Sequence, residues 1–129
     1  MRSTAAGLLM TLCLGMGGCA LLTGAGVATA GVIWLNGEAK KIYPVTLDAA
    51  FEASVRTMNN MGLSMLEQKR SGEGWYLRSR RPTDAEEVKI TIQSSSQNST
   101  EVKVRVGVTG DRAYSERLLT AVGEQLQGS

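Results

Sequence analysis

The side chains best suited to bind another molecule are three arginines that follow two aromatic residues in the second half of the chain. Arg78, Arg80 and Arg81 come shortly after Trp75 and Tyr76. On a strand, Tyr76, Arg78 and Arg80 would point to the same side, because successive residues alternate between the two faces. A guanidinium group binds phosphate or carboxylate through paired hydrogen bonds. The cluster therefore predicts a surface for lipid headgroups, lipopolysaccharide phosphates or an acidic partner.

The same arginines have a second interpretation, in which they serve only the fold. Charged side chains on an exposed strand discourage pairing with strands of other molecules. Acidic residues on neighbouring strands would then be their cross-strand partners, and the candidates are Glu67, Glu86 and Glu87. Both interpretations stay open at the level of the sequence, and the positions of these carboxylates decide between them.

A cysteine with distinctive surroundings lies near the amino terminus. Met16-Gly17-Gly18-Cys19 follows a short basic start and an apolar run, which is the arrangement of a secretory signal peptide. The four residues resemble the bacterial lipobox, in which an aliphatic residue and two small residues precede a cysteine. In the lipobox that cysteine is diacylated and becomes the mature amino terminus. We therefore predict a lipoprotein signal peptide over residues 1–18 and lipidation at Cys19.

The segment after this cysteine is predicted to be a tether. Residues 19–31 are rich in glycine and would connect the lipid to the folded domain. Ala20, where some lipoproteins have Asp, resembles the pattern that permits transfer to the outer membrane of Gram-negative bacteria. An uncleaved membrane-spanning helix is the alternative, because residues 5–35 contain no charge and a span needs about 20 apolar residues. Both interpretations export the rest of the chain.

Composition limits the chemistry that this chain can perform. It contains no histidine, and its two cysteines both lie in the apolar leader, which excludes a zinc site, a disulfide framework and a histidine-activated nucleophile. Glu86 and Glu87 are adjacent, so on a strand they would face opposite sides and could not flank one glycosidic bond. After removal of residues 1–18, the chain has 13 basic and 12 acidic side chains, a balance that indicates no nucleic-acid binding. We expect no enzyme, no cofactor and no metal.

The elements that position these residues are predicted to follow the apolar leader. Apart from Arg2, all charges lie in residues 36–129, so we expect a single periplasmic domain over 32–129. Asn36-Gly37 predicts a tight hairpin. Thr46 predicts the start of a helix over 47–60, with the apolar stripe Leu47, Ala50, Phe51, Val55 and Met58. Asp111 predicts the start of a helix over 112–125, with the stripe Leu118, Leu119, Val122 and Leu126.

Extended segments are expected between the two helices. Residues 63–69 and 75–80 flank a turn rich in glycine and charge. Residues 88–93 and 102–106 alternate valine or isoleucine with polar residues, on either side of a polar loop, and this alternation predicts one buried face. The predicted order is hairpin, helix, three strands, helix. This is an α+β domain in which a small antiparallel sheet carries two helices on one face.

Several of these features together resemble a known family. They are the lipobox, the glycine-rich stretch, Leu35-Asn36-Gly37-Glu38, Tyr43-Pro44, Thr46-Leu47-Asp48, and Val106-Gly107-Val108-Thr109-Gly110-Asp111 with Ser115. With them, nearly the whole chain resembles a family of small bacterial lipoproteins known only as domain of unknown function 3568. The resemblance implies an envelope location and a fold, and it supplies no catalytic residue.

These observations give one expected function and two alternatives. We expect a lipid-anchored envelope lipoprotein, attached to the outer membrane and facing the periplasm, that acts as a non-catalytic interaction or structural module. The first alternative is a protein that binds a small molecule or lipid, with Trp75, Phe51 and the methionines lining a pocket between helix and sheet. The second alternative is an uncleaved single-span membrane protein with an exported domain.

Overall fold

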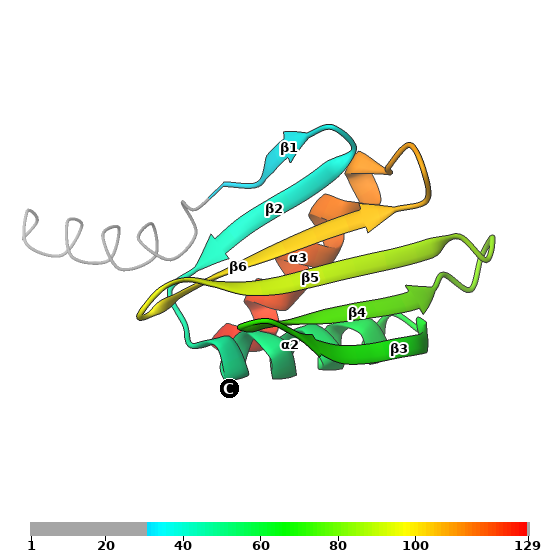
Figure 1. The fold of residues 1–129 in the computed structure, drawn as a ribbon. Helices are drawn as coiled ribbons and strands as arrows, with labels where there is room; N and C mark the ends of the chain where they lie inside the picture. Colours follow the sequence, from blue (N-terminus) through cyan, green and yellow to red (C-terminus); the bar gives the residue numbers. More distant parts are fainter. Residues whose placement is uncertain (1–30, 129) are drawn as a thin grey trace, which may run out of the picture. The chain divides into compact units, whose positions relative to one another are not determined.

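Six strands and two helices form the fold that the computed structural model describes for residues 31–128 (Figure 1). In chain order they are β1 (Ile33–Leu35), β2 (Glu38–Tyr43), α2 (Leu47–Asn60), β3 (Ser64–Ser71), β4 (Gly74–Arg80), β5 (Glu87–Ser96), β6 (Ser99–Val106) and α3 (Arg112–Gln127). The predicted signal peptide, the cleavage motif, Cys19 and the tether up to residue 30 lie outside the described residues. Within residues 31–128, no helix is long and apolar enough to cross a membrane.

The strands form one sheet in which every neighbouring pair is antiparallel, in the order β1-β2-β6-β5-β4-β3. Helix α3 packs on β2 and β6, whereas α2 packs on β5, β6 and β3, so both helices cover the same face (Figure 1). This confirms the predicted α+β class. The structure has four strands between the helices instead of the three in the predicted order, because both segments around the turn at Gly72 and both alternating segments form strands.

Local sequence accounts for the turns and the helix starts. Asn36 and Gly37 both have positive φ values, 55° and 83°, as the predicted tight hairpin requires. Thr46 caps α2 by accepting a hydrogen bond from the backbone of Ala49, and Asp111 caps α3 in the same way. The predicted polar loop over 94–100 is shorter in the structure, because β5 and β6 continue pairing up to Ser96 and Ser99.

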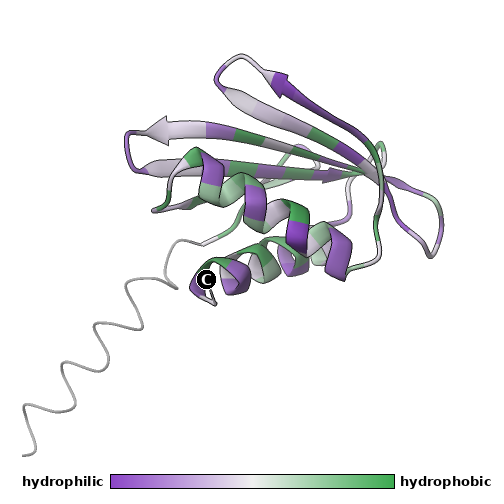
Figure 2. Ribbon diagram, turned by 90° about the horizontal axis from the view of Figure 1, so that it is seen from below, coloured by the Kyte–Doolittle hydropathy of each residue, from purple (hydrophilic) through white to green (hydrophobic). Residues whose placement is uncertain are grey.

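The core lies between the sheet and the helices, where the alternating residues of β5 and β6 meet the helix stripes (Figure 2). The side chains that β5 and β6 send into this core are all nearly or fully buried, namely Val88, Ile90, Ile92, Val102, Val104 and Val106. The predicted stripe of α2 is only partly correct. Ala50 and Met58 are buried, but so are Ala53, Ser54 and Thr57, because α3 packs beside α2 and covers a second side of it.

Candidate functional site

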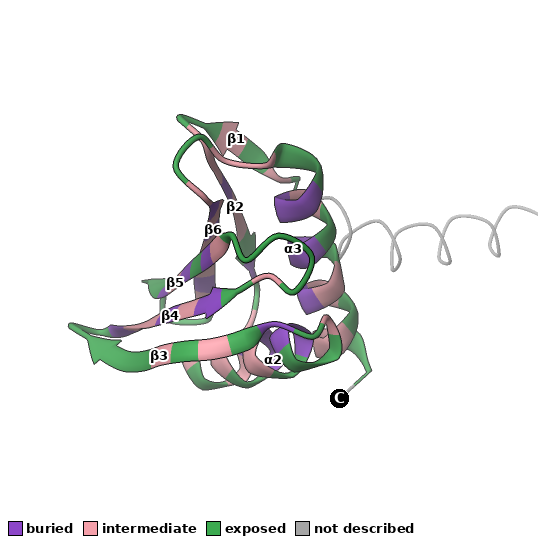
Figure 3. Ribbon diagram, turned by 90° about the vertical axis from the view of Figure 1, so that its right-hand side faces the viewer, coloured by how far each residue is buried: buried purple, intermediate pink, exposed green. Residues whose placement is uncertain are grey.

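The face of the sheet that points away from α2 and α3 is covered by no other element of residues 31–128 (Figure 3). We call it the open face. Strand registers place seven basic and four acidic side chains on it: Lys40, Lys69, Arg78, Arg80, Lys89, Lys103, Arg105, Glu38, Glu67, Glu87 and Glu101. Lys69, Arg80 and Lys89 are exposed, and the other eight are half-buried.

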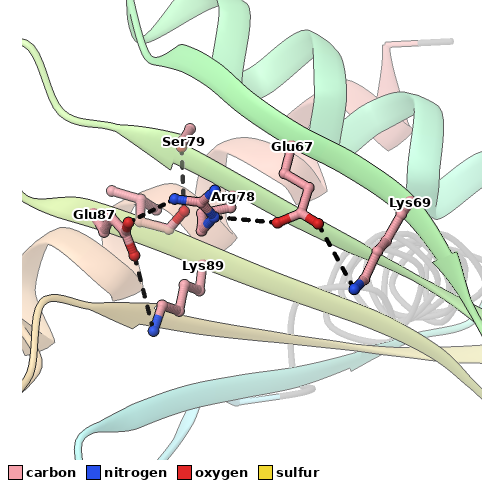
Figure 4. Close-up of polar contacts among 7 residues, drawn as sticks. Glu67, Lys69, Arg78, Ser79, Glu87 and Lys89 are labelled. Carbon is pink, nitrogen blue, oxygen red and sulfur yellow. Dashed lines mark hydrogen bonds and ion pairs between the residues drawn. The ribbon is translucent and has the colours of Figure 1, made fainter.

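Arg78, which the sequence singles out, lies between two carboxylates on the open face (Figure 4). Its Nη1 donates to Glu87 Oε2 at 2.7 Å, and its Nε donates to Glu67 Oε1 at 3.2 Å. These hydrogen bonds, that with Glu87 first, raise the pKa of Arg78. Lys69 and Lys89 lie 3.7 Å and 3.9 Å from the same two carboxylates. Arg78 is therefore paired with acids on β3 and β5. This agrees with the second interpretation of the arginines, which gave Glu67 and Glu87 as cross-strand partners.

Tyr76 and Arg80 share this face with Arg78, as the alternation along the strand predicted. Tyr76 lies opposite Thr91 on β5 and Lys69 on β3, and the ammonium group of Lys69 lies 5.8 Å from its ring centroid. Arg80 is exposed at the end of β4 and forms no ion pair within residues 31–128. The structure thus brings three of the four predicted surface residues together, and Arg80 is the one whose charge is available.

Arg81 lies apart from them, on the side of the sheet that carries the helices. Its Nη2 donates to Asp84 at 2.7 Å, its Nη1 donates to Asp111 at 3.0 Å, and its guanidinium carbon lies 4.7 Å from the ring centroid of Tyr114. The side chain is only 13% exposed. Arg81 therefore connects the end of β4 with the start of α3 and does not belong to the predicted binding surface.

Arg81 also sets the titration of its two partners. Its hydrogen bonds lower the pKa of Asp84 to about 2. The pKa of Asp111 is lowered first by the backbone N–H of Tyr114, which Asp111 accepts as the helix cap, and then by Arg81. The two carboxylates in turn raise the pKa of Arg81. All three groups are charged at neutral pH, and their ion pairs join the end of β4 to the start of α3.

The centre of the open face carries a second group of cations, which sequence reasoning missed. Lys40 on β2 lies directly opposite Lys103 on β6, and Lys89 on β5 lies directly opposite Arg105 on β6. We call these four residues the basic cluster. Within residues 31–128, only Lys89 has a carboxylate within ion-pairing distance, that of Glu87. Like charges directly opposite each other destabilise a sheet, so this arrangement has a cost.

Arg105 has a structural role as well. Its Nη1 donates to the carbonyl of Asn36 at 2.9 Å, and its Nη2 donates to the carbonyl of Val108. These contacts hold the β1–β2 turn beside the turn after β6. Both acceptors are neutral carbonyls, and Glu38, directly opposite Arg105 on β2, forms no ion pair with it. The sequence shows that Lys103 and Arg105 lie on the same face of β6. It does not show that β2 pairs with β6, which brings Lys40 beside them.

The side chains that the small-molecule hypothesis assigns to a pocket pack against the core, and a hollow of about 230 Å³ lies beside Phe51, Val55 and Gln68. The rings of Phe51 and Trp75 stack with centroids 4.0 Å apart, and Met58 is fully buried. A shallow groove of about 590 Å³ lies elsewhere, between Pro82, Met61 and Tyr114. The described residues contain no group of three or more potential metal ligands placed to hold an ion. The open face is thus the best candidate for a functional surface.

Comparison with known proteins identifies a family. The chain matches the family described as Protein of unknown function (DUF3568) over residues 4–125. Because this match covers nearly the whole chain, the chain belongs to that family, and the predicted membership of domain of unknown function 3568 is confirmed. The lipid anchor stays a prediction. No curated protein matches the chain. The description of the family names no activity, so function has to be argued from the chain's own residues.

Proposed function

We propose that this protein is a lipid-anchored module of the bacterial cell envelope that binds an anionic envelope component through the open face and catalyses no reaction. The observation that carries the proposal is the basic cluster. Four cations occupy adjacent positions on three neighbouring strands, and three of them have no carboxylate within ion-pairing distance among the described residues. Such an arrangement of like charges lowers the stability of the fold, and an anionic partner would relieve the repulsion.

The anchor in this proposal rests on the sequence. Cys19 follows Met16, Gly17 and Gly18 after an apolar run, so the residues that lipidation needs are present in the right order. The described domain forms a compact unit from residue 32 onward. Residues 20–31 would then join this unit to the lipid, and the domain would face the periplasm from the outer membrane.

A binding role also fits the chemistry of the open face better than catalysis does. Arginine and lysine recognise phosphate and carboxylate groups without a perturbed acid or base. Among the described residues, the carboxylates with a lowered pKa, Asp84 and Asp111, are both held by Arg81 away from this face. A general acid would instead need a raised pKa.

Site-specific photocrosslinking in cells tests the use of the open face. A photoreactive amino acid replaces Gln93, which is exposed on this face, or Thr120, which is exposed on α3. We expect adducts from position 93 and none from position 120, with the products identified by mass spectrometry as protein, lipid or glycolipid. Adducts from position 120 alone, or from neither position, would overturn the proposal that this face binds a partner.

Fractionation of the Cys19→Ala variant tests the anchor separately. If Cys19 is acylated, the wild-type protein begins at Cys19, whereas Cys19→Ala is neither acylated nor cleaved before residue 19 and is retained, if at all, only through its apolar leader. A wild-type protein that keeps residues 1–18 would instead support the uncleaved single-span alternative. The mass of the amino-terminal peptide of the wild-type protein shows directly whether acyl chains are attached.

A further inference from the structure

The open face combines its cations with exposed aliphatic side chains, and this combination points to one partner. We propose that the open face lies against the phosphate headgroups of the same bilayer that anchors the chain. The proposal rests on the proposed function, because it requires that the chain be attached to a membrane. It names the anionic component as a lipid surface instead of a protein.

The aliphatic side chains lie at one edge of the face, next to the basic cluster. Ile33 and Leu35 on β1 are 54% and 57% exposed, and β1 places them opposite Lys40 and Glu38 of β2. Ile42, two residues beyond Lys40 on the same face, is 42% exposed. Trp34, between the two exposed residues of β1, instead packs against the core. Exposed aliphatic groups beside lysine and arginine are typical of surfaces that rest in the headgroup region of a bilayer.

The cations of the cluster suit a planar array of phosphates. Lys40, Lys103, Arg105 and Lys89 occupy adjacent positions on β2, β6 and β5, so their charged ends lie over one area of a sheet surface. A layer of headgroups presents many anions in one plane and can neutralise all four at once. Arg78, by contrast, already has two carboxylates and adds little. Two acids adjoin the cluster: Glu38 on β2 lies directly opposite Arg105, and Glu101 lies two residues before Lys103 on β6, but neither forms an ion pair within the described residues.

The length of the tether makes this contact possible at modest intrinsic affinity. The twelve residues from 20 to 31 span at most roughly 40 Å when fully extended. The chain then enters the domain through β1, the strand that carries Ile33 and Leu35. Docking is therefore intramolecular, and the high effective concentration favours it.

Lysine footprinting of the complete acylated protein in reconstituted vesicles tests the inference. The protein is acetylated in vesicles of phosphatidylcholine alone or mixed with phosphatidylglycerol, and mass spectrometry gives the rate at each lysine. We expect Lys40, Lys89 and Lys103 to react severalfold more slowly in the anionic vesicles, and high salt to remove this difference. Lys41 is the internal reference, because it lies on β2 but points to the opposite face. Equal rates in both vesicles would overturn the inference.

A matched pair of variants connects the protection to the basic cluster. Lys103→Glu should weaken the docking of the anionic vesicles roughly fivefold or more, and the rates at Lys40 and Lys89 should rise accordingly. Arg112→Glu changes the net charge equally, but its side chain lies on α3, so protection should persist. Loss of protection in both variants would show an effect of net charge alone and would overturn the assignment to this face.

Flotation of the vesicles separates failure of this inference from failure of the proposed function. A chain that does not float with either vesicle contradicts the lipid anchor. A chain that floats with both vesicles but shows unprotected lysines retains the anchor and contradicts only the docking. Protection of the three lysines in cells, combined with none in protein-free vesicles, would assign the face to an acidic protein and likewise overturn the docking.

Discussion

Two basic sites in this domain, Arg81 and the basic cluster, differ in the acids that surround them. Arg81 is 13% exposed and is held by Asp84, Asp111 and the ring of Tyr114. In the basic cluster, only Lys89 has a carboxylate within ion-pairing distance among the described residues. An arginine in the sequence therefore says little about function until its neighbours are known, because the same group can complete a fold or remain available to a partner.

The difference also separates stability from function. The Arg81 site joins the end of β4 to the cap of α3, so its charges are cancelled where the chain needs a fixed connection. The basic cluster gathers four like charges, of which only Lys89 forms an ion pair among the described residues, on a face that no described element covers. Substitutions at the first site should lower the free energy of unfolding, whereas charge reversal in the second should raise it and impair binding.

The largest expected effect is that of Arg81→Ala. The variant loses hydrogen bonds to two carboxylates and the contact with the Tyr114 ring. We expect the free energy of unfolding to fall by about 1–2 kcal/mol, near the low end for charged hydrogen bonds, because both carboxylates are more than a third exposed and regain water. Urea unfolding followed by circular dichroism measures it.

The neighbouring Arg80→Ala is the matched control for this prediction. Arg80 is exposed at the end of the same strand and forms no ion pair within the described residues. Its removal should change the free energy of unfolding by less than about 0.5 kcal/mol. If both variants were equally stable, Arg81 would not hold β4 to α3, and the contrast between the two sites would fail.

A smaller effect is the dependence of the Arg81 contribution on pH. In the folded protein the pKa of Asp84 is about 2, and that of Asp111 is also below its usual value. A carboxylate with a lowered pKa contributes its full stabilisation above about pH 4, and that contribution is lost as the pH falls towards about 2. The difference between wild type and Arg81→Ala should therefore shrink over this interval. A difference that stayed constant down to about pH 2 would contradict the ion pairs.

Local signals made much of this fold predictable. The start and end of α2, the Asn36-Gly37 turn and the buried alternation of β5 and β6 all depend on residues close in sequence, and all were predicted. Cross-strand partners depend on register between distant segments. Glu67, Glu86 and Glu87 were predicted as cross-strand neighbours of the arginines. Glu67 and Glu87 pair with Arg78, whereas Glu86 lies before the start of β5 and forms no ion pair within the described residues. The pairing of Lys40 with Lys103 joins strands more than fifty residues apart, and no short-range pattern specifies it.

The burial of Arg81 was unpredictable for a related reason. Its position beside Asp111 follows from how the chain turns after β4 and from where α3 begins, two features that only the tertiary structure brings together. The sequence shows three arginines within four positions. Strand alternation predicts that Arg78 and Arg80 share one face and that Arg81 does not, but it does not show what Arg81 contacts. The structure thus changes which cations are candidates for binding without changing the type of chemistry that they offer.

The smallest expected effect, and the one that most sharply distinguishes the two sites, is a gain of stability from Lys103→Glu. In the wild type, Lys103 lies opposite Lys40 and two residues from Arg105 on the same face. Reversal of its charge replaces repulsion with attraction across the pair and should raise the free energy of unfolding by about 0.2–1 kcal/mol. Lys103→Gln should give a smaller increase, and salt should reduce both. A loss of stability in Lys103→Glu would mean that the cluster is already neutralised within the fold, and then its arrangement would no longer argue for an anionic partner.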